Sequence, residues 1–130
     1  MRLRLWIFAD PGAFEAELDQ ILADPHQAVF VAVRSNGQPC GFIEVTIRKF
    51  ADGCETGPVG YIEGWYVEED LRHHGVGAQL VRAAEDWARG LGMREMGSDT
   101  WWDNDISIEA HRKLGYEEIE RLVHFAKRLN

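Results

Sequence analysis

The sequence predicts a mixed α/β fold in which helices cover the faces of one central sheet. Apolar residues recur at helical spacing over 13–23 and 75–92, and this spacing predicts two amphipathic helices. Between them lie apolar, β-branched runs separated by glycine-rich turns, which predict strands. A chain of 130 residues with 45% hydrophobic residues can bury one core, so residues 1–130 are expected to form a single domain.

The first predicted helix is followed by a β-hairpin. Residues 13–23 place their apolar side chains on one stripe, and Pro25 ends that helix. The run "AVFVAV" (28–33) predicts a strand, and the Asn-Gly pair in "SNGQ" predicts a tight turn into a return strand at 40–50.

A polar loop over 51–58 separates this hairpin from the next strand, which is predicted at 60–69. Gly64 lies inside that strand, and an interior strand glycine is typical of a bulge or of a close backbone approach. The helix at 75–92 follows.

The last third of the chain is predicted to contain a strand, a helix and a strand. The segment 93–100 predicts a short strand, and 103–116 predicts a helix whose free amides are capped by Asp103 or Asn104. Residues 117–129 alternate like a strand. The resulting order, α-β-β-β-α-β-α-β, fits a mixed sheet with helices on its faces.

Charge and composition exclude some classes of function. A net charge of −8 argues against binding nucleic acid and suits a cationic partner. No apolar run is long enough to span a bilayer and no signal peptide is recognised, so no membrane association is expected. Cys40 and Cys54 are expected to be reduced thiols, as in a cytoplasmic protein.

The stretch "LRHHGVGAQL" (71–80) places two glycines where a helix should begin. Free amides and a positive dipole mark a helix N-terminus, and Gly75 and Gly77 would let phosphate oxygens reach those amides. Arg72 adds a fixed positive charge. The pattern lacks the Gly-Lys-Ser/Thr of nucleoside-triphosphate hydrolases. By itself the stretch fits a tight structural turn equally well.

In its context the stretch resembles a known family. The strand before it, the helix after it and the following "SDT…N…LGY" pattern resemble the GCN5-related N-acetyltransferase superfamily over nearly the whole chain. The segments "GYIEGWYVEEDLRHHGVGAQLVRAAEDWARGLGMREMGSDT" and "NDISIEAHRKLGYEEIERLVHF" resemble the aminoglycoside 6′-N-acetyltransferases. The resemblance implies acetyl-coenzyme A as cosubstrate, no metal, acetylation of an aminoglycoside 6′-amino group by direct attack on the thioester, and a homodimer. The superfamily begins with a strand, for which this chain offers no good candidate, so either the first edge strand is absent or the chain begins differently.

The resemblance also implies residues that bind the coenzyme. The strand positions Trp65, Tyr66 and Val67 would pair with the pantetheine arm through main-chain groups, and the Val67 amide would stabilise the oxyanion. The pyrophosphate loop would consist of Arg72, His73, His74, Gly75, Val76, Gly77 and Ala78. Asn104 matches a helix-start asparagine that contacts the coenzyme, although it also fits a simple helix cap.

Three carboxylates are candidates for the acceptor site. An amine must be uncharged to attack a thioester, and a polycationic substrate needs acidic groups for positioning. Glu63, Asp99 and Glu120 match positions of the aminoglycoside pocket in this family. Asp99 is the preferred general base, directly or through water, and Glu63 would anchor the amine or share in deprotonation. A strand-end cap at Asp99, and solvent-facing strand positions at Glu63 and Glu120, are the structural alternatives.

Aromatic residues complete the predicted substrate site. Trp6 and Phe50 match positions that contact the aminoglycoside in this family, and tryptophan can stack on a sugar face or a cationic amine. A packing role is open for Trp6. Trp101 and Trp102 are candidates for the mouth of the pocket, with one of them expected to pack inward.

His111 departs from the family pattern, because much of the superfamily has a tyrosine there that protonates the leaving thiolate. Histidine can supply a proton at neutral pH, and a purely structural role with solvent as the acid stays open. His73 and His74 are adjacent and cannot share a helical face, so a metal site is not expected.

Two other functions stay open on the sequence alone. The acceptor could be a polyamine, a peptide amino terminus or another small amine. A non-catalytic protein that senses acyl-coenzyme A would also need an intact glycine loop.

Overall fold

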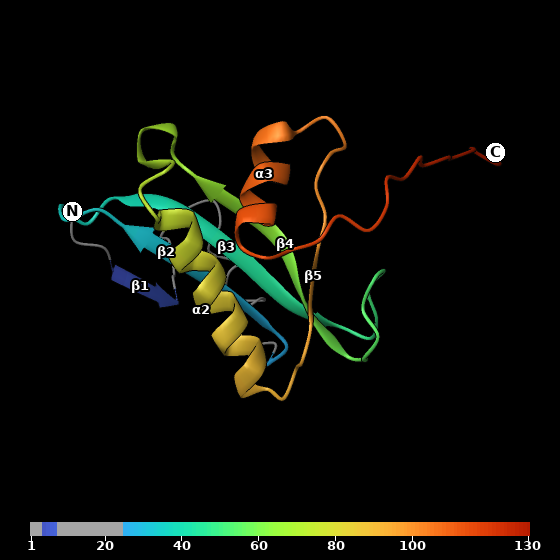
Figure 1. Cartoon of the computed structure of the whole chain (residues 1–130), viewed down its shortest axis with the longest axis horizontal. Coiled ribbons are helices and arrows are strands. Elements are labelled where there is room, and N and C mark those ends of the chain that lie inside the picture. The colour runs from blue at the N-terminus through green and yellow to red at the C-terminus, as the bar shows by residue number, and fades with distance from the viewer. Residues whose placement is uncertain (1–3, 8–24) are drawn as a thin grey trace. The chain divides into compact units, whose positions relative to one another are not determined.

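The computed structural model describes residues 4–7 and 25–130 (Figure 1). It divides the chain into two compact units, Met1–Ser98 and Asp99–Asn130, which are considered in turn. The helix predicted over 13–23 lies outside the described residues.

Within its described residues, the first unit contains one five-stranded sheet with the order β1-β2-β3-β4-β5. β1 to β4 pair antiparallel with their neighbours, and β4 pairs with β5 in parallel. This arrangement confirms the predicted mixed sheet, in which most strand pairs are antiparallel. The strands are β1 (Arg4–Ile7), β2 (Gln27–Val33), β3 (Pro39–Arg48), β4 (Val59–Val67) and β5 (Met96–Ser98).

The first edge strand is present, so the alternative in which it is absent was wrong. The segment "RLWI" forms β1 and pairs antiparallel with β2, from Arg4 opposite Val33 to Ile7 opposite Phe30. Four residues are too few for an alternating pattern to stand out, and their partner strand begins only at Gln27. The pairing of β1 with β2 therefore depends on contacts between distant parts of the chain, which local sequence does not reveal.

The hairpin between β2 and β3 forms as predicted. The amide of Arg34 donates to the carbonyl of Gln38 at 2.8 Å, and Gly37 adopts a left-handed φ of 88°. The side chain of Asn36 accepts a hydrogen bond from the amide of Gln38 at 3.0 Å. The Asn-Gly signal thus marks the turn for two reasons, side-chain bonding by Asn36 and backbone freedom at Gly37.

A bulge interrupts β4 beside Gly64, as an interior strand glycine predicted. Glu44 pairs with Gly64 and Val45 pairs with Ile62, so Glu63 is the extra residue on β4. An extra residue reverses the inward and outward alternation of the strand beyond it. The bulge therefore decides which face of the sheet each of the last residues of β4 occupies.

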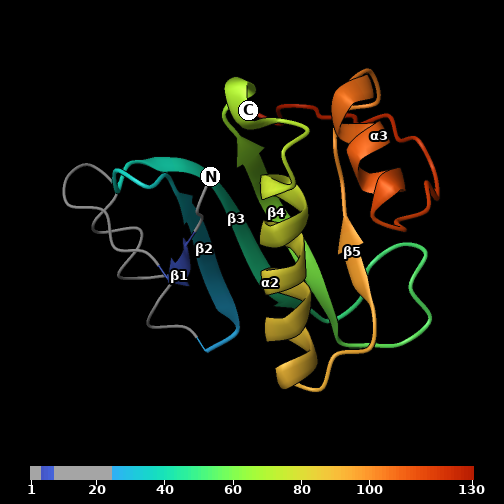
Figure 2. The same cartoon turned by 60° about the vertical axis from the view of Figure 1, so that its left-hand side comes forward.

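Helix α2 (Val76–Gly90) covers one face of β3 and β4 (Figure 2). A Cβ atom at Gly41 would lie 3.3 Å from Leu80, and one at Gly60 would lie 3.0 Å from Ala88. The fully buried side chains of β3 and α2 fill the space between them, among them Ile43, Val45, Leu80 and Val81. A short 3₁₀ turn, η1 (Glu69–Leu71), leads from β4 towards α2. No helix in 4–7 and 25–130 combines the length and the apolar character needed to cross a membrane.

The second unit contains helix α3 (Asp105–Lys113). The Asn104 side chain accepts a hydrogen bond from the amide of Ser107 at 3.1 Å, which confirms the predicted cap and selects Asn104 over Asp103. The strand predicted over 117–129 is wrong, because these residues form neither helix nor strand and are exposed. An alternating pattern becomes a strand only where a neighbouring strand supplies hydrogen bonds.

Candidate functional site

Helix α2 begins without a side-chain cap. Its N-cap residue is Gly75, whose φ of 83° lies in the left-handed region and which has no side chain to cap the first turn. Helix α3 differs, because Asn104 caps it. The first amides of a helix lack intrahelical partners and carry a partial positive charge. The start of α2 is therefore suited to an anion such as a pyrophosphate.

The two glycines of this loop have different roles. A Cβ atom at Gly75 would meet nothing within 4 Å, so open space lies beside it and its positive φ explains the residue. A Cβ atom at Gly77 would lie 3.1 Å from Cζ2 of Trp65. Gly77 therefore makes room for Trp65, a packing role in addition to the one predicted for it beside phosphate.

Arg72 and His73 shape the segment that precedes the helix. The Nε atom of Arg72 donates to the Val67 carbonyl at 3.1 Å, and its guanidinium carbon lies 5.9 Å from the centre of the Tyr66 ring. His73 has a φ of 67°, which is uncommon for a residue other than glycine. This placement is consistent with Arg72 contributing its positive charge, and His73 its main-chain groups, to the predicted pyrophosphate loop.

The edge of β4 beyond Ile62 is free of β5. Pairing with β5 ends at Ile62 opposite Ser98, whereas β4 continues to Val67. The amide of Glu68 donates to the Cys40 carbonyl at 2.9 Å. This bond shows which residue pairs of β3 and β4 are hydrogen-bonded and which are not.

In antiparallel pairs, hydrogen-bonded and non-hydrogen-bonded positions alternate. The main-chain groups of Trp65 and Val67 therefore point away from β3, towards this edge. Those of Tyr66 point towards Phe42 on β3, its register partner. Of the three strand positions predicted to bind pantetheine through the main chain, Trp65 and Val67 have the required direction, and Tyr66 does not.

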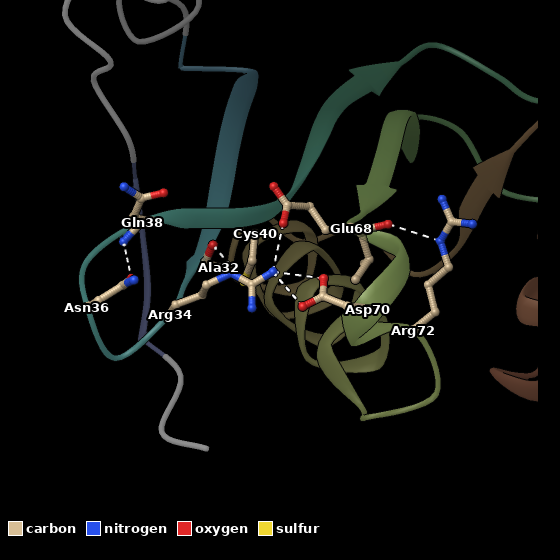
Figure 3. Close-up of polar contacts among 9 residues, drawn as sticks. Ala32, Arg34, Asn36, Gln38, Cys40, Glu68, Asp70 and Arg72 are labelled. Atoms are coloured by element: carbon tan, nitrogen blue, oxygen red, sulfur yellow. Dashed lines mark hydrogen bonds and ion pairs between the residues drawn. The ribbon is translucent and has the colours of Figure 1, made fainter.

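Arg34 ties the β2–β3 hairpin to the segment before α2 (Figure 3). Its Nη2 atom lies 2.7 Å from Oε2 of Glu68 and 2.8 Å from Oδ1 of Asp70. The hydrogen bond from Arg34 lowers the pKa of Asp70. Glu68 is half-buried and Asp70 is exposed, so water screens these ion pairs and their contribution to stability is small.

Glu63 lies at the bulge and is held by two residues of β3. Arg48 donates to it from Nε at 2.8 Å and from Nη2 at 2.6 Å, and the Thr46 hydroxyl donates at 2.7 Å. Burial by itself would raise the pKa of Glu63, but the hydrogen bonds from Arg48 and Thr46 and the charge of Arg48 outweigh burial and lower it. Glu63 is therefore ionised and is a weak base, which favours an anchoring role over that of general base.

Sequence reasoning missed Arg48 and Thr46. Phe42, Glu44, Thr46 and Arg48 are alternate residues of β3 and share one face of the sheet. Gly41 is on the other face, where it meets Leu80 of α2, so these four residues lie on the face opposite α2. The alternation of "FIEVTIR" contains this signal. The pairing with Glu63 depends on the bulge, which no local pattern locates to one residue.

The second unit contains the other predicted carboxylates. Asp99 follows directly after β5 and is exposed, as a strand-end position predicts. Glu120 is exposed in the segment without regular structure, so its expected place on an edge strand is wrong. Trp101 and Trp102 are 75% and 63% exposed, and the expectation that one of them packs inward is also wrong. Asn104 is the α3 cap, and its amide nitrogen can still donate.

His111 lies on α3 and has a defined tautomer when it is neutral. Its Nδ1 atom lies 2.7 Å from the Ser107 carbonyl, which can only accept, so Nδ1 carries the proton. The lone pair is then on Nε2. His111 can donate a proton from Nε2 only as the imidazolium. Its ring also packs edge-on against Tyr116, with centroids 5.8 Å apart.

The remaining predicted residues lie at the start of the chain and after β3. Trp6 is in β1, in register with Val31 of β2. Phe50 lies just beyond β3 and is 76% exposed. Over residues 4–7 and 25–130, no three His, Cys, Asp or Glu side chains gather closely enough to hold a metal ion. The uncapped α2 start and the β4 edge that β5 does not pair with fit the pyrophosphate and pantetheine of a coenzyme A molecule.

Comparison with known proteins places the chain in a family. Residues 2–116 match the model of the acetyltransferase (GNAT) family. The chain is 43% identical over 126 residues to aminoglycoside N(6′)-acetyltransferase type 1 of Stenotrophomonas maltophilia, which covers 96% of this chain and 81% of that protein. The enzyme of the same name from Klebsiella aerogenes is 39% identical, with coverage of 99% and 87%.

Solved structures agree with this assignment. The structure of AAC(6′)-Iy with the bisubstrate analogue CoA-S-monomethyl-acetylneamine superimposes with a TM-score of 0.88 at 33% identity, covering 98% of this chain and 99% of that one. AAC(6′)-Ih from Acinetobacter baumannii has a TM-score of 0.87 at 26% identity, with coverage of 99% and 100%. The family model, the sequence relatives and these structures lead to one conclusion: the chain belongs to the GNAT family of acetyltransferases.

Proposed function

We propose that the protein is an acetyl-coenzyme A-dependent aminoglycoside 6′-N-acetyltransferase. The observation that carries the proposal is the uncapped start of α2, next to a β4 edge free of β5, with the ionised Glu63 on the same strand. The relatives named aminoglycoside N(6′)-acetyltransferase type 1 support the acceptor class. The family match spans the boundary between the two units, which supports one acetyltransferase domain over residues 1–130.

The coenzyme would be bound by main-chain groups and one guanidinium. The amides at the start of α2 would accept the pyrophosphate, with charge added by Arg72. The outward main-chain groups of Trp65 and Val67 would pair with the pantetheine arm. The Val67 amide would donate to the thioester oxygen as negative charge develops on it.

Acetyl transfer forms a bond between the acceptor nitrogen and the thioester carbon and breaks the carbon–sulfur bond. The nitrogen loses one proton overall, and the departing thiolate gains one. Asp99 would accept the proton of the amine, directly or through water. Glu63 and Glu120 would hold cationic or hydroxyl groups of the substrate, and Trp6 and Phe50 would contact its rings.

His111 is the candidate acid for the thiolate. Since its Nδ1 proton is committed to the Ser107 carbonyl, this role requires the imidazolium, which would deliver its second proton from Nε2. If solvent protonates the thiolate instead, His111 does not need to be an imidazolium. A rate that falls with the deprotonation of His111 would identify the histidine as the acid.

The assay is thiol release from acetyl-coenzyme A in the presence of kanamycin or tobramycin. Release that depends on the aminoglycoside supports the proposal. Release with a polyamine or peptide amine alone would assign a different acceptor to the same fold. Tight coenzyme binding without release in any of these assays would indicate a sensor and would contradict the proposal.

We further propose that the protein is a cytoplasmic homodimer. Exposed apolar side chains after α3 support self-association, among them Ile119, Leu122, Val123 and Phe125. Both cysteines are free thiols, which fits a reducing compartment. Sedimentation equilibrium at micromolar concentration would give twice the chain mass, and a monomer at all concentrations would contradict the dimer.

A further inference from the structure

Arg48 and Glu63 form a paired charge inside the proposed acceptor site. The guanidinium donates from both Nε and Nη2 to the two carboxylate oxygens, at 2.8 and 2.6 Å. Such two-pronged contacts are shorter and more directional than single ion pairs. The side chains of Arg48 and Glu63 are 44% and 27% exposed, so water screens the pair in part. The charge of Glu63 is thus matched before any substrate arrives.

The position of Arg48 is fixed from a second direction. Its guanidinium carbon lies 3.6 Å from the centre of the Tyr61 ring, a cation–π contact. Tyr61 is opposite Thr46 in the β3–β4 register, and Thr46 donates to the same carboxylate. Glu63 therefore has one preferred orientation, set by a charged donor and a neutral donor on β3.

This pairing matters for an enzyme whose acceptor is an amine. A lone carboxylate next to the acceptor would stabilise the ammonium form and raise the pKa of the bound amine. Only the uncharged amine can attack the thioester. A carboxylate whose charge is matched by a guanidinium still accepts a hydrogen bond, but it favours the ammonium form much less.

We propose that Arg48 is a positioning residue that lets Glu63 orient the acceptor amine without stabilising its protonated form. The inference rests on the proposed acetyltransferase function and adds a residue to it. Arg48 acts through Glu63 and needs no contact with the substrate.

Other charged groups near Glu63 do not duplicate this role. Within the described residues, Glu44 is the other carboxylate on this face of β3, and its negative charge acts in the same direction as that of Glu63. Among the described residues, Arg48 is the cation that contacts Glu63, so its removal takes away the positive charge that these contacts supply.

The test compares Arg48→Gln with Arg48→Lys and Thr46→Val, using acetyl-coenzyme A and kanamycin over a range of pH. In Arg48→Gln, the acid limb of the kcat profile is expected to move to higher pH by about one unit. The KM for kanamycin is expected to fall about two- to fivefold, because the ammonium gains an unmatched carboxylate. Arg48→Lys keeps the positive charge, so its acid limb should lie at nearly the same pH as that of the wild type. Thr46→Val keeps the charge of Arg48 and removes one hydrogen bond to Glu63, so it should move the limb less than Arg48→Gln does.

A purely structural role gives a different result. An unshifted acid limb together with a raised KM in Arg48→Gln would overturn the inference. If Arg48→Gln does not fold, Arg48→Met retains an unbranched stem against Tyr61 and serves as the variant without charge.

A second readout does not depend on turnover. Carbon-13 NMR of the Glu63 carboxyl in the unliganded protein should show its pKa rising in the variants that lack the charge. An unchanged titration would overturn the inference. Failure of the wild-type protein to acetylate kanamycin would instead contradict the proposed function, while this titration still decides whether Arg48 controls Glu63.

Discussion

Gly77 and Trp65 pack directly against each other: a Cβ atom on Gly77 would lie 3.1 Å from Cζ2 of the indole. The first turn of α2 can approach β4 only because this position has no side chain. The bulge at Glu63 turns Trp65 towards α2, on the same side as Gly60. The loop that favours an anion is therefore attached to the strand that contains the proposed acceptor ligand.

Gly77→Ala tests this contact. Alanine favours a helix over glycine by about 0.5–1 kcal/mol, but here its methyl group meets the indole, and overpacking costs about 1–3 kcal/mol. We expect a net loss of stability in thermal denaturation and a change in tryptophan fluorescence. Gly90→Ala, at the open end of α2, is the matched control and should stabilise the protein. Equal stabilisation by both substitutions would contradict the contact.

Gly75→Leu tests the anion site. A leucine side chain would occupy the space beside the helix start, and the left-handed φ of 83° would disfavour it. Calorimetry should show coenzyme A affinity reduced about tenfold or more, since one lost charge-assisted contact has that size. The kcat at saturating coenzyme should change less. A large loss of kcat at unchanged affinity would count against a pyrophosphate site here.

Glu63→Gln tests the pH dependence of stability. The folded protein holds the pKa of Glu63 below its usual 4.5, so the stabilising contribution is complete above that value and is lost as pH falls through the folded pKa. The variant should be less stable than wild type at pH 7 by at most about 1 kcal/mol after solvent screening. The difference should vanish in acid. Denaturant titrations across pH measure this difference.

Asp99→Asn tests the proposed general base. Removing a general base typically lowers turnover by about two to four orders of magnitude. We expect a loss of kcat in that range, with coenzyme A affinity changed by less than about twofold. Asp103→Asn alters a nearby carboxylate on the same unit and should leave kcat close to wild type. The assignment fails if coenzyme affinity falls while kcat persists.

Much of the fold follows from local sequence, because local patterns specify local structure. The periodicity of α2, the Asn-Gly hairpin and the Asn104 cap each involve residues close together in the chain, and all three are present. Gly64 indicated a bulge for the same reason. β1 escaped prediction because four residues contain little periodicity and their pairing with β2 is non-local.

The charge pairing at the site was less predictable. Glu63 was identified, but its Arg48 partner depends on the β3–β4 register and on the position of the bulge. Conversely, the alternation over 117–129 predicted a strand that is absent, since a pattern does not specify its hydrogen-bonding neighbour. Both failures concern pairings between segments, which depend on the register and the partner strand.

The most direct test of the account uses neomycin B and paromomycin, which differ only in having an amino or a hydroxyl group on the 6′ carbon. The purified protein is incubated with acetyl-coenzyme A and each compound, and thiol release and product mass are followed. We predict thiol release and addition of one acetyl group to neomycin B, and neither with paromomycin. Equal acetylation of both compounds, or of neither, would contradict 6′-N-acetylation.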